Sequence, residues 1–296
     1  MLNAPILSPG QKLRDLMAAG IVTMPGVFNG ISAITAFKAG SQALYLSGAG
    51  ATNAWLGAPD IAIISQTELA AIAAQCCSVA PVPILSDADT GFGETSNVMR
   101  TVIDMERAGL AGIHLEDQVS PKRCGHLDGK DVIPAVEMEK KLRAAVDSKR
   151  DSSFIICART DARGVEGLDS AVERAKRYAG AGADAIFPEG LESEAEFEAF
   201  RSAVDVPLLA NMTEFGKTPI IPVSRFKELG YNMVIFPMTA FRMMLQALDQ
   251  TYKELIQVGT QEKLLDQMKT RKELYQILGY DEYTAKDAAW ANTPER

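Results

Sequence analysis

The sequence predicts a protein of the α/β class, a (β/α)8 barrel of the TIM type with extra C-terminal helices. Eight short apolar segments alternate with stretches of helical character, a pattern typical of parallel strands buried on both faces. A glycine able to cap a helix precedes several of these segments by a few residues. The length of 296 residues suits one barrel domain over 1–296, because no low-complexity linker divides the chain.

The elements follow in order along the chain. Ser8-Pro9 starts a leading helix that is expected to end before Gly20. The eight predicted strands span residues 21–27, 43–47, 82–85, 111–116, 154–158, 184–189, 206–209 and 233–237. Four of the strands follow a helix that ends on a glycine: Gly40, Gly109, Gly182 and Gly230. Helices between strands are expected over 31–38, 66–78, 96–108, 136–148, 168–179 and 193–203.

The segment after the eighth strand, about 239–296, contains more helix than one barrel unit needs. Helices are expected over 239–257 and 261–278. Such an extension either packs on its own barrel or is lent to a neighbouring subunit.

Composition narrows the class of protein. With 47% hydrophobic and 23% charged residues, the chain can bury a large core, which argues against disorder. A net charge of −8 without a basic run disfavours nucleic-acid binding. No segment approaches the ~18 apolar residues of a membrane span, and no export signal is recognisable. The four cysteines lack disulfide or zinc spacing, which predicts reduced thiols and a cytoplasmic protein.

Two acids close the third predicted strand. Asp87 and Asp89 follow an apolar run and precede a glycine-containing loop. In an extended chain, residues i and i+2 point the same way, so both carboxylates could face one site and bind Mg2+. Alone the pattern is weak, because Asp also favours turns and helix N-caps. The other strand ends, however, are polar as well: Asn29, Ser47, Gly48, Ala49, Gly50, Glu116, Asp117, Arg159, Asp161, Glu189, Asn211, Thr213 and Arg242.

These polar strand ends predict one charged pocket, because catalytic groups of (β/α)8 barrels lie at the carboxyl ends of the strands. The acids suit a divalent cation, and Arg159 and Arg242 suit substrate carboxylates. Ser47 and the glycines after it offer a hydroxyl and backbone N–H groups to another oxyanion; a phosphate cradle there is disfavoured, since the flanking pattern is not Walker-like. The combination predicts a polycarboxylate or 2-oxo acid site with a metal.

The longest loop, from 117 to about 134, contains Lys122-Arg123-Cys124-Gly125-His126. The two cations and the histidine favour the Cys124 thiolate, and such a cysteine can take part in proton transfer. The alternative is an incidental surface cysteine, but a long loop over a barrel mouth is often a lid. His114 is interpreted as a satisfied polar residue at a strand end, and His126 as a support for the loop.

Several motifs together resemble the isocitrate lyase / phosphoenolpyruvate mutase superfamily. They lie at residues 87–93, 116–118, 122–126, 158–162, 211–216, 239–242 and 270–275, so the resemblance covers nearly the whole chain. The motif at 122–126 is the most specific, because phosphonate-forming mutases look similar around Asp87 but lack it. Isocitrate lyases share the motif but are usually longer and tend to carry Trp near the position of Phe187. Ala49 departs from the Gly that is common there, which matters little if the backbone N–H is what is used.

The resemblance implies Mg2+-dependent retro-aldol cleavage of a C–C bond, with Mn2+ as an alternative ion. The most similar branch acts on a small tricarboxylate, 2-methylisocitrate, and gives pyruvate and succinate in the methylcitrate cycle. Cleavage of isocitrate, or an oxaloacetate-type C–C hydrolase or lyase reaction, stays open as the alternative. A phosphonomutase would not need Cys124, and a non-enzymatic binding protein is the least favoured reading.

The resemblance also implies residue roles. Asp87 and Asp89 would hold the metal, with Glu116 reaching it through water. Cys124 would protonate the carbanion, with Tyr45, His126 and Glu116 in further catalytic roles. The implied substrate-binding residues are Ser47, Gly48, Ala49, Cys124, Gly125, Arg159, Phe187, Glu189, Asn211, Thr213, Pro237, Arg242 and Arg271. The C-terminal helix would be exchanged between subunits of a homotetramer.

Overall fold

The computed structural model describes residues 8–123, 125 and 129–291. The chain divides into two compact units, Met1–Phe241 and Arg242–Arg296, and each is described by itself. Their assignment to one domain stays a prediction.

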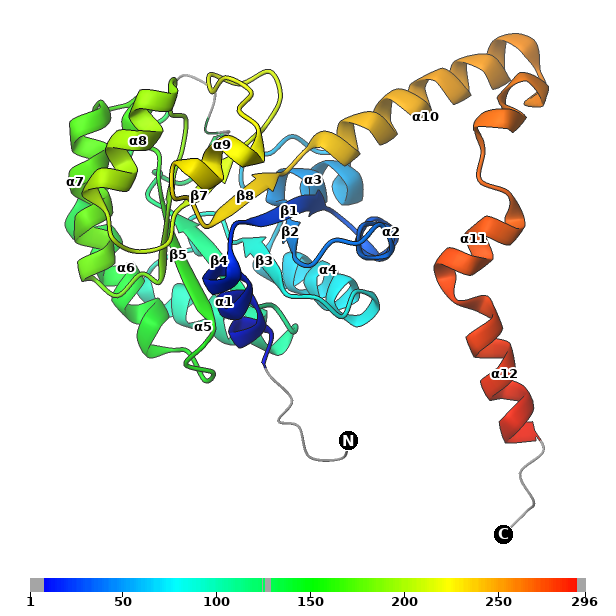
Figure 1. The fold of residues 1–296 in the computed structure, drawn as a ribbon, viewed down its shortest axis with the longest axis horizontal. Helices are drawn as coiled ribbons and strands as arrows, with labels where there is room; N and C mark the ends of the chain where they lie inside the picture. Colours follow the sequence, from blue (N-terminus) through cyan, green and yellow to red (C-terminus); the bar gives the residue numbers. More distant parts are fainter. Residues whose placement is uncertain (1–7, 124, 126–128, 292–296) are drawn as a thin grey trace. The chain divides into compact units, whose positions relative to one another are not determined.

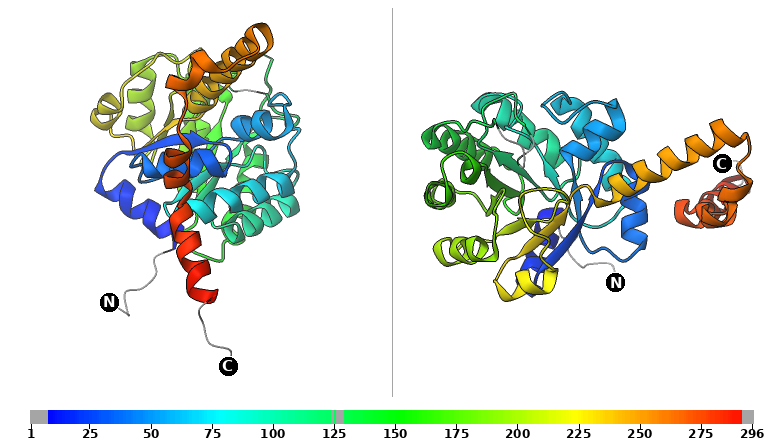
Figure 2. Two further views of the ribbon diagram at one scale, coloured as in Figure 1. Left: turned by 90° about the vertical axis from the view of Figure 1, so that its right-hand side faces the viewer. Right: turned by 90° about the horizontal axis from the view of Figure 1, so that it is seen from above.

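The first unit is built on eight parallel strands surrounded by helices (Figures 1 and 2). The strands are β1 (Val22–Val27), β2 (Leu44–Leu46), β3 (Ile84–Asp87), β4 (Gly112–Glu116), β5 (Ile155–Thr160), β6 (Ala185–Pro188), β7 (Leu209–Asn211) and β8 (Met233–Phe236). They are hydrogen-bonded in the order β6-β5-β4-β3-β2-β1-β8-β7. A parallel bridge between Ile186 and Leu208 joins the two ends of this order, so the predicted (β/α)8 barrel is confirmed.

The helices of the first unit agree closely with the predicted ranges. They are α1 (Pro9–Ala19), α2 (Gly30–Lys38), α3 (Gly48–Ala51), α4 (Gln66–Val79), α5 (Thr95–Arg107), α6 (Ala135–Asp147), α7 (Leu168–Gly180), α8 (Glu194–Ala203) and α9 (Val223–Glu228). Short α3, the π-helical turn η1 (Thr52–Leu56), the 3-10 turn η2 (Ala162–Gly164) and α9 were not predicted, because segments this short have no clear period.

Local signals account for the helix boundaries. The Ser8 side chain accepts a hydrogen bond from the Gln11 N–H, and Pro9 occupies the first turn of α1. Ser65 and Glu68 form a reciprocal capping box at the start of α4. The four helix-ending glycines have φ between 77° and 101°, the left-handed range in which glycine is favoured.

Side chains alternate between two apolar layers. One layer fills the space between strands and helices, and the other fills the barrel interior, where Leu85, Cys157 and Met233 are fully buried. Leu13 and Met17 of α1 belong to the interior layer and close the barrel at the amino ends of its strands. Full burial of a side chain such as Leu13 stabilises the fold by ~1.5–3 kcal/mol.

The second unit is helical. Its elements are α10 (Thr239–Val258), which starts in the first unit, the 3-10 turn η3 (Glu262–Gln267), α11 (Arg271–Leu278) and α12 (Tyr280–Ala291). The prediction of one helix over 261–278 is wrong, because Thr270 and Glu273 form a capping box that starts a new helix. In the part of this unit that is described, neither α11 nor α12 has a buried residue.

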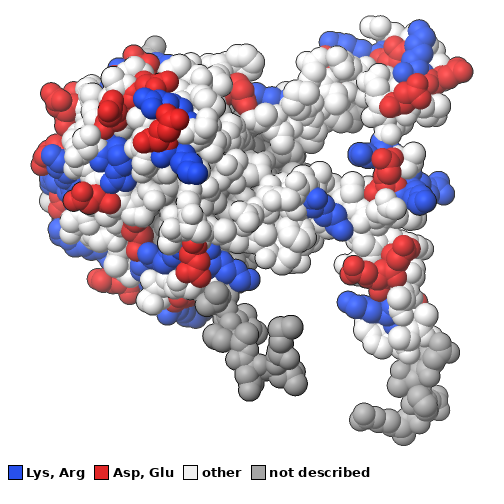
Figure 3. All heavy atoms as spheres, viewed as in Figure 1, with Lys and Arg blue, Asp and Glu red and all other residues white. Residues whose placement is uncertain are grey.

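Two surface properties bear on partners. Among the described helices, none is both long and apolar enough to cross a membrane. On the face of the first unit seen in Figure 3, acidic and basic side chains are interspersed.

Candidate active site

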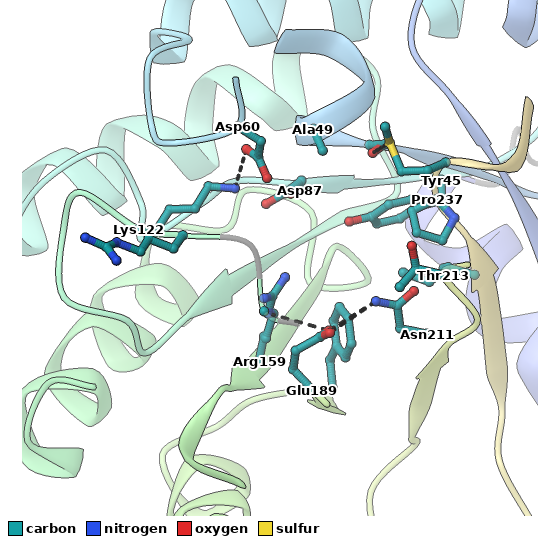
Figure 4. Close-up of a pocket in the computed structure, with 16 residues that line it drawn as sticks. Tyr45, Ala49, Asp60, Asp87, Lys122, Arg159, Glu189, Asn211, Thr213 and Pro237 are labelled. Atoms are coloured by element: carbon teal, nitrogen blue, oxygen red, sulfur yellow. Dashed lines mark hydrogen bonds and ion pairs between the residues drawn. The ribbon is translucent and has the colours of Figure 1, made fainter. Parts of the chain in front are cut away.

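A cavity lies at the carboxyl ends of the strands (Figure 4). Its lining residues come from strands β2 to β8 and the loops that follow them: Tyr45, Ser47, Ala49, Asp60, Asp87, Lys122, Arg123, Gly125, Arg159, Phe187, Glu189, Asn211, Thr213, Ile235, Pro237 and Met238. Most of these lining residues are among those that the sequence analysis singled out, and their roles stay predictions.

The first acidic residue, Asp87, ends β3 and lines the cavity. Burial raises the pKa of Asp87, but the charges of His114, Lys122 and Arg159 outweigh it and bring the pKa to about 2. Asp87 is therefore an anion at neutral pH. The Asp89 N–H donates to Asp87 Oδ1 at 2.9 Å.

The expectation that Asp89 continues an extended strand is wrong. β3 ends at Asp87, and Asp89 has a φ of 46°, a conformation that Asp tolerates better than most residues. The two carboxylates are instead held by a turn. Asp89 Oδ1 lies 2.8 Å from the Lys122 ammonium.

Lys122 lines the cavity and pairs with two acids, which is not the role that its motif at 122–126 indicates. Its buried ammonium lies 2.6 Å from Asp60 Oδ1 as well as near Asp89, whereas the sequence motif predicts a role in favouring the Cys124 thiolate. Burial lowers the pKa of Lys122, but Asp89, Asp87, Glu116 and Asp60 outweigh burial and hold the pKa well above its usual value. Asp60 gave no sequence signal, because it lies in an irregular loop before α4.

Arg159 forms the opposite side of the cavity. Asp161 accepts hydrogen bonds from Arg159 Nε (2.9 Å) and NH2 (3.1 Å), and Glu116 Oε2 lies 3.2 Å from NH1. The guanidinium carbon lies 5.2 Å from the Phe187 ring centroid, a cation–π geometry. Arg159 is thus held in one orientation with little freedom, as a planar fork for a carboxylate requires.

Tyr45 and His114 form a buried pair beside Asp87. The Tyr45 hydroxyl and His114 Nε2 are 2.8 Å apart, and His114 Nε2 lies 3.6 Å from Asp87 Oδ1. Burial is the main cause that lowers the pKa of His114 to about 4, so the imidazole is neutral at pH 7. Burial, and then the Asp87 charge, raise the pKa of Tyr45 well above its usual value, so the phenol keeps its proton. The interpretation of His114 as a satisfied polar residue holds only for Nε2, because the buried Nδ1 has no hydrogen-bond partner among the described residues.

The remaining predicted residues of the wall lie at the ends of β2, β6, β7 and β8. Asn211 Nδ2 donates to both carboxylate oxygens of Glu189, at 3.3 and 3.2 Å. Ser47 caps α3 by accepting a hydrogen bond from the Gly50 N–H at 3.0 Å. Thr213 and Pro237 complete the wall near Asn211 (Figure 4).

The loop after β4 lies close to Glu189 and Arg159 in the cavity wall. A Cβ at Gly125 would lie 2.4 Å from Glu189 Cγ and 2.5 Å from Arg159 NH2, so only glycine fits there. The Lys130 ammonium donates to the Gly125 carbonyl and lies 3.0 Å from Asp161 Oδ1. Lys130 and Met238 are site residues that the sequence analysis missed.

Seven predicted residues are not among those that line this cavity. Gly48, Asp89 and Glu116 are described but are not part of its lining, and Asp89 lines a separate hollow with residues of α4 and α5. Cys124 and His126 lie outside the described residues. Arg242 and Arg271 belong to the second unit. Their roles stay predictions.

The donor set suits a small divalent cation. Asp87, Asp89, Glu116, Asp161 and Glu189 are buried acids, and they face three basic groups, Lys122, Lys130 and Arg159. Neither Glu116 oxygen accepts a hydrogen bond from a described residue, although Oε2 is near Arg159. No described cluster has three side chains arranged around a common metal position. Two carboxylates with water and substrate are nevertheless what Mg2+ commonly uses.

A cavity of this composition at the carboxyl ends of a (β/α)8 barrel is typical of an enzyme active site. Residues 13–256 match the sequence profile of the phosphoenolpyruvate phosphomutase family. The chain belongs to this family.

Individual relatives are similar over almost the whole chain. A 2-methylisocitrate lyase of Aeropyrum pernix is 52% identical over 289 residues, which cover 97% of this chain and 93% of the relative. The crystal structure of a 2,3-dimethylmalate lyase has a TM-score of 0.91 at 34% identity and covers 96% of both chains. A phosphonopyruvate hydrolase in complex with oxalate and Mg2+ has a TM-score of 0.87 at 26% identity, covering 97% of this chain and 100% of the other.

Proposed function

We propose that this protein is a 2-methylisocitrate lyase that cleaves 2-methylisocitrate to pyruvate and succinate by a retro-aldol reaction. The observation that carries the proposal is the juxtaposition, in one cavity, of the Asp87 carboxylate with the rigidly held Arg159 fork. This pairing provides a metal-type acid beside a carboxylate-binding group. Relatives named 2-methylisocitrate lyase, similar over nearly the whole chain, support the choice of substrate.

Different residues of the site would bind the substrate carboxylates, bury the methyl group and supply the proton. Arg159, Asn211 and Thr213 would bind substrate carboxylates, with the Ser47–Ala49 turn offering backbone N–H groups. Phe187 and Pro237 form an apolar part of the wall, where a methyl group can be buried. Cys124, in the loop after β4, would donate a proton to the carbanion of the succinate half.

Asp87 and Asp89 would hold the metal, with Glu116 acting through water. When bound, Mg2+ supplies Lewis-acid stabilisation of the negative charge that develops on the substrate oxygen. The pKa values of Tyr45 and His114 keep both side chains neutral beside Asp87. Neither of them therefore adds a charge that would repel the cation or pair with the Asp87 carboxylate in its place. The single charge of Lys122 pairs with both Asp60 and Asp89 and offsets part of the repulsion between the buried acids.

We extend the proposal to assembly and location. The chain is expected to form a homotetramer in the cytoplasm, with C-terminal helices exchanged between subunits. The absence of buried residues in the described α11 and α12 supports this, because isolated short helices are marginal in water. Light scattering of the purified protein measures the assembly, and a monomer would contradict it.

One experiment tests the activity. The purified protein with Mg2+ is given 2-methylisocitrate, isocitrate, 2,3-dimethylmalate, oxaloacetate or phosphoenolpyruvate, and the products are identified. We expect pyruvate and succinate from 2-methylisocitrate, abolished by a chelator and by Asp87→Ala. Asp104→Ala, on the outer helix α5, is the matched control and should retain turnover. Preferential conversion of another acid would replace this proposal.

A further inference from the structure

Asp117 is a buried carboxylate that the proposed reaction does not use. It directly follows Glu116, the last residue of β4. Neighbouring side chains at a strand end point to opposite faces. Glu116 accordingly contacts Arg159, whereas Asp117 contacts Tyr178 and Arg174 of the outer helix α7. Asp117 is fully buried and does not line the cavity.

Both oxygens of Asp117 are engaged by the end of β5 and the helix behind it. Oδ1 accepts from the backbone N–H of Asp161 at 2.9 Å. Oδ2 accepts from the Thr160 hydroxyl at 2.8 Å and the Tyr178 hydroxyl at 2.7 Å, with Arg174 NH1 at 3.4 Å. A buried carboxylate with this many donors is strongly fixed, because losing any partner leaves an unpaired polar group.

These contacts lead directly to the substrate-binding group. Thr160 and Asp161 are the two residues after Arg159, and Asp161 takes the two parallel hydrogen bonds from the Arg159 guanidinium. Asp117 therefore holds the backbone of the residue that in turn orients the fork. Arg174, which contacts Asp117 from helix α7, is itself held in place. It donates to both oxygens of Glu166 at 2.8 Å and to the Ile133 carbonyl at 2.9 Å.

We propose that Asp117 is a positioning residue for substrate binding, which acts through Asp161 on the orientation of Arg159. The proposal rests on the proposed function, in which Arg159 binds a substrate carboxylate. Its energetic basis is preorganisation: a guanidinium already held in the binding orientation loses less freedom when the carboxylate arrives. The proposal therefore predicts that loss of Asp117 raises KM and leaves kcat nearly unchanged.

Asp117→Asn keeps the size of the side chain and removes its charge. Loss of a partner that orients a metal-ligating residue typically costs about 10–100-fold, and we expect a factor of up to that order for a partner that orients Arg159. Because Arg159 binds ground state and transition state alike, we expect KM for 2-methylisocitrate to rise by about that factor, with kcat within about 3-fold of wild type. A merely structural role would instead reduce the folded, active fraction, so kcat would fall and KM would stay constant.

Two variants keep the test sharp. Tyr178→Phe removes one hydrogen bond to Oδ2 but leaves the bond to the Asp161 N–H, so KM should change by less than about 3-fold. Should Asp117→Asn fail to fold, Thr160→Val is the second test. Unlike Tyr178, Thr160 lies between Arg159 and Asp161, and its hydroxyl both donates to Asp117 and accepts a hydrogen bond from the Ala162 N–H, so its loss frees the segment that carries Asp161 and should raise KM about 3-fold or more. An unchanged KM in Thr160→Val would then overturn the proposal.

A double-mutant cycle tests the route through Arg159. In an Arg159→Lys background the fork is gone, so Asp117→Asn should change KM by less than about 2-fold. The same fold-change in both backgrounds would show that Asp117 acts independently of Arg159. Failure of the wild-type protein to cleave 2-methylisocitrate would count against the proposed function, whereas normal wild-type turnover with unchanged KM in Asp117→Asn would count against this inference alone.

Discussion

The substitution Gly48→Ala places one methyl group against the acid that ends β3. A Cβ at this position would lie 2.6 Å from Asp87 Oδ2 and 2.8 Å from Asp87 Cγ. Ordinary van der Waals contact begins near 3.4 Å, so the carboxylate must retreat by about 0.8 Å. Asp87 is buried and already accepts a hydrogen bond from the Asp89 N–H, so the carboxylate cannot move without giving up that contact.

We expect this displacement to weaken metal binding more than it weakens the fold. Disturbing the support of a metal ligand costs about 10–100-fold in affinity, which corresponds to ~1.4–2.7 kcal/mol. Overpacking typically destabilises a protein by ~1–3 kcal/mol. Titration with Mn2+ followed by electron paramagnetic resonance measures the affinity, and thermal unfolding measures the fold.

The control is Gly180→Ala at the end of α7, where an added Cβ meets no atom within 4 Å. That variant should bind Mn2+ as the wild type does and unfold at the same or a slightly higher temperature. If Gly48→Ala binds Mn2+ within 2-fold of wild type, Asp87 does not ligate the metal in the way proposed.

Three further outcomes are expected. Cys124→Ser should lower kcat by about 10²–10⁴-fold at unchanged Tm, whereas Cys157→Ser, in the barrel interior, should lower Tm more than kcat; normal turnover by Cys124→Ser would assign the proton to another residue. Because Phe187 gives a methyl group apolar room, kcat/KM should favour 2-methylisocitrate over isocitrate by about 10–200-fold, and equal values would contradict this. Burial raises the pKa of Asp161, but the Arg159 guanidinium outweighs it and brings the pKa to about 2, below the ~3.9 of an unfolded chain. The ion pair therefore stabilises the fold above about pH 4 and loses this effect as the pH falls towards 2, so Asp161→Asn should flatten Tm against pH in that window; an identical slope in both proteins would refute the assignment.

The fold was predictable because the relevant signals are local and repeated. Each helix-ending glycine and apolar strand segment can be recognised within a few residues, and (β/α)8 topology places the carboxyl ends of the strands together. Ser47, Glu189 and Asn211 were therefore assigned to one cavity without knowledge of their contacts. The polar character of the strand ends was enough.

The unpredicted features depend on long-range contacts. Asp60 is 62 residues from Lys122, and no pattern in either segment indicates that they form an ion pair. The turn that gives Asp89 a positive φ was hidden by an apparently continuous strand. Lys130 was not singled out, because a lysine in a long loop is usually solvated. Burial, charge and reach across the barrel mouth decide such contacts, and sequence spacing does not report them.

Helix α1 gives the barrel a closed end, because Leu13 and Met17 pack into the interior layer beneath the strands. Substrate and both products of a cleavage in the cavity must therefore use the same passage at the carboxyl ends. The fragment bound nearer the floor cannot depart while the other lies above it, so product release is sequential. The product released last should compete directly with the substrate for the empty enzyme. The product released first should inhibit with a mixed pattern, so steady-state inhibition identifies which fragment lies deeper.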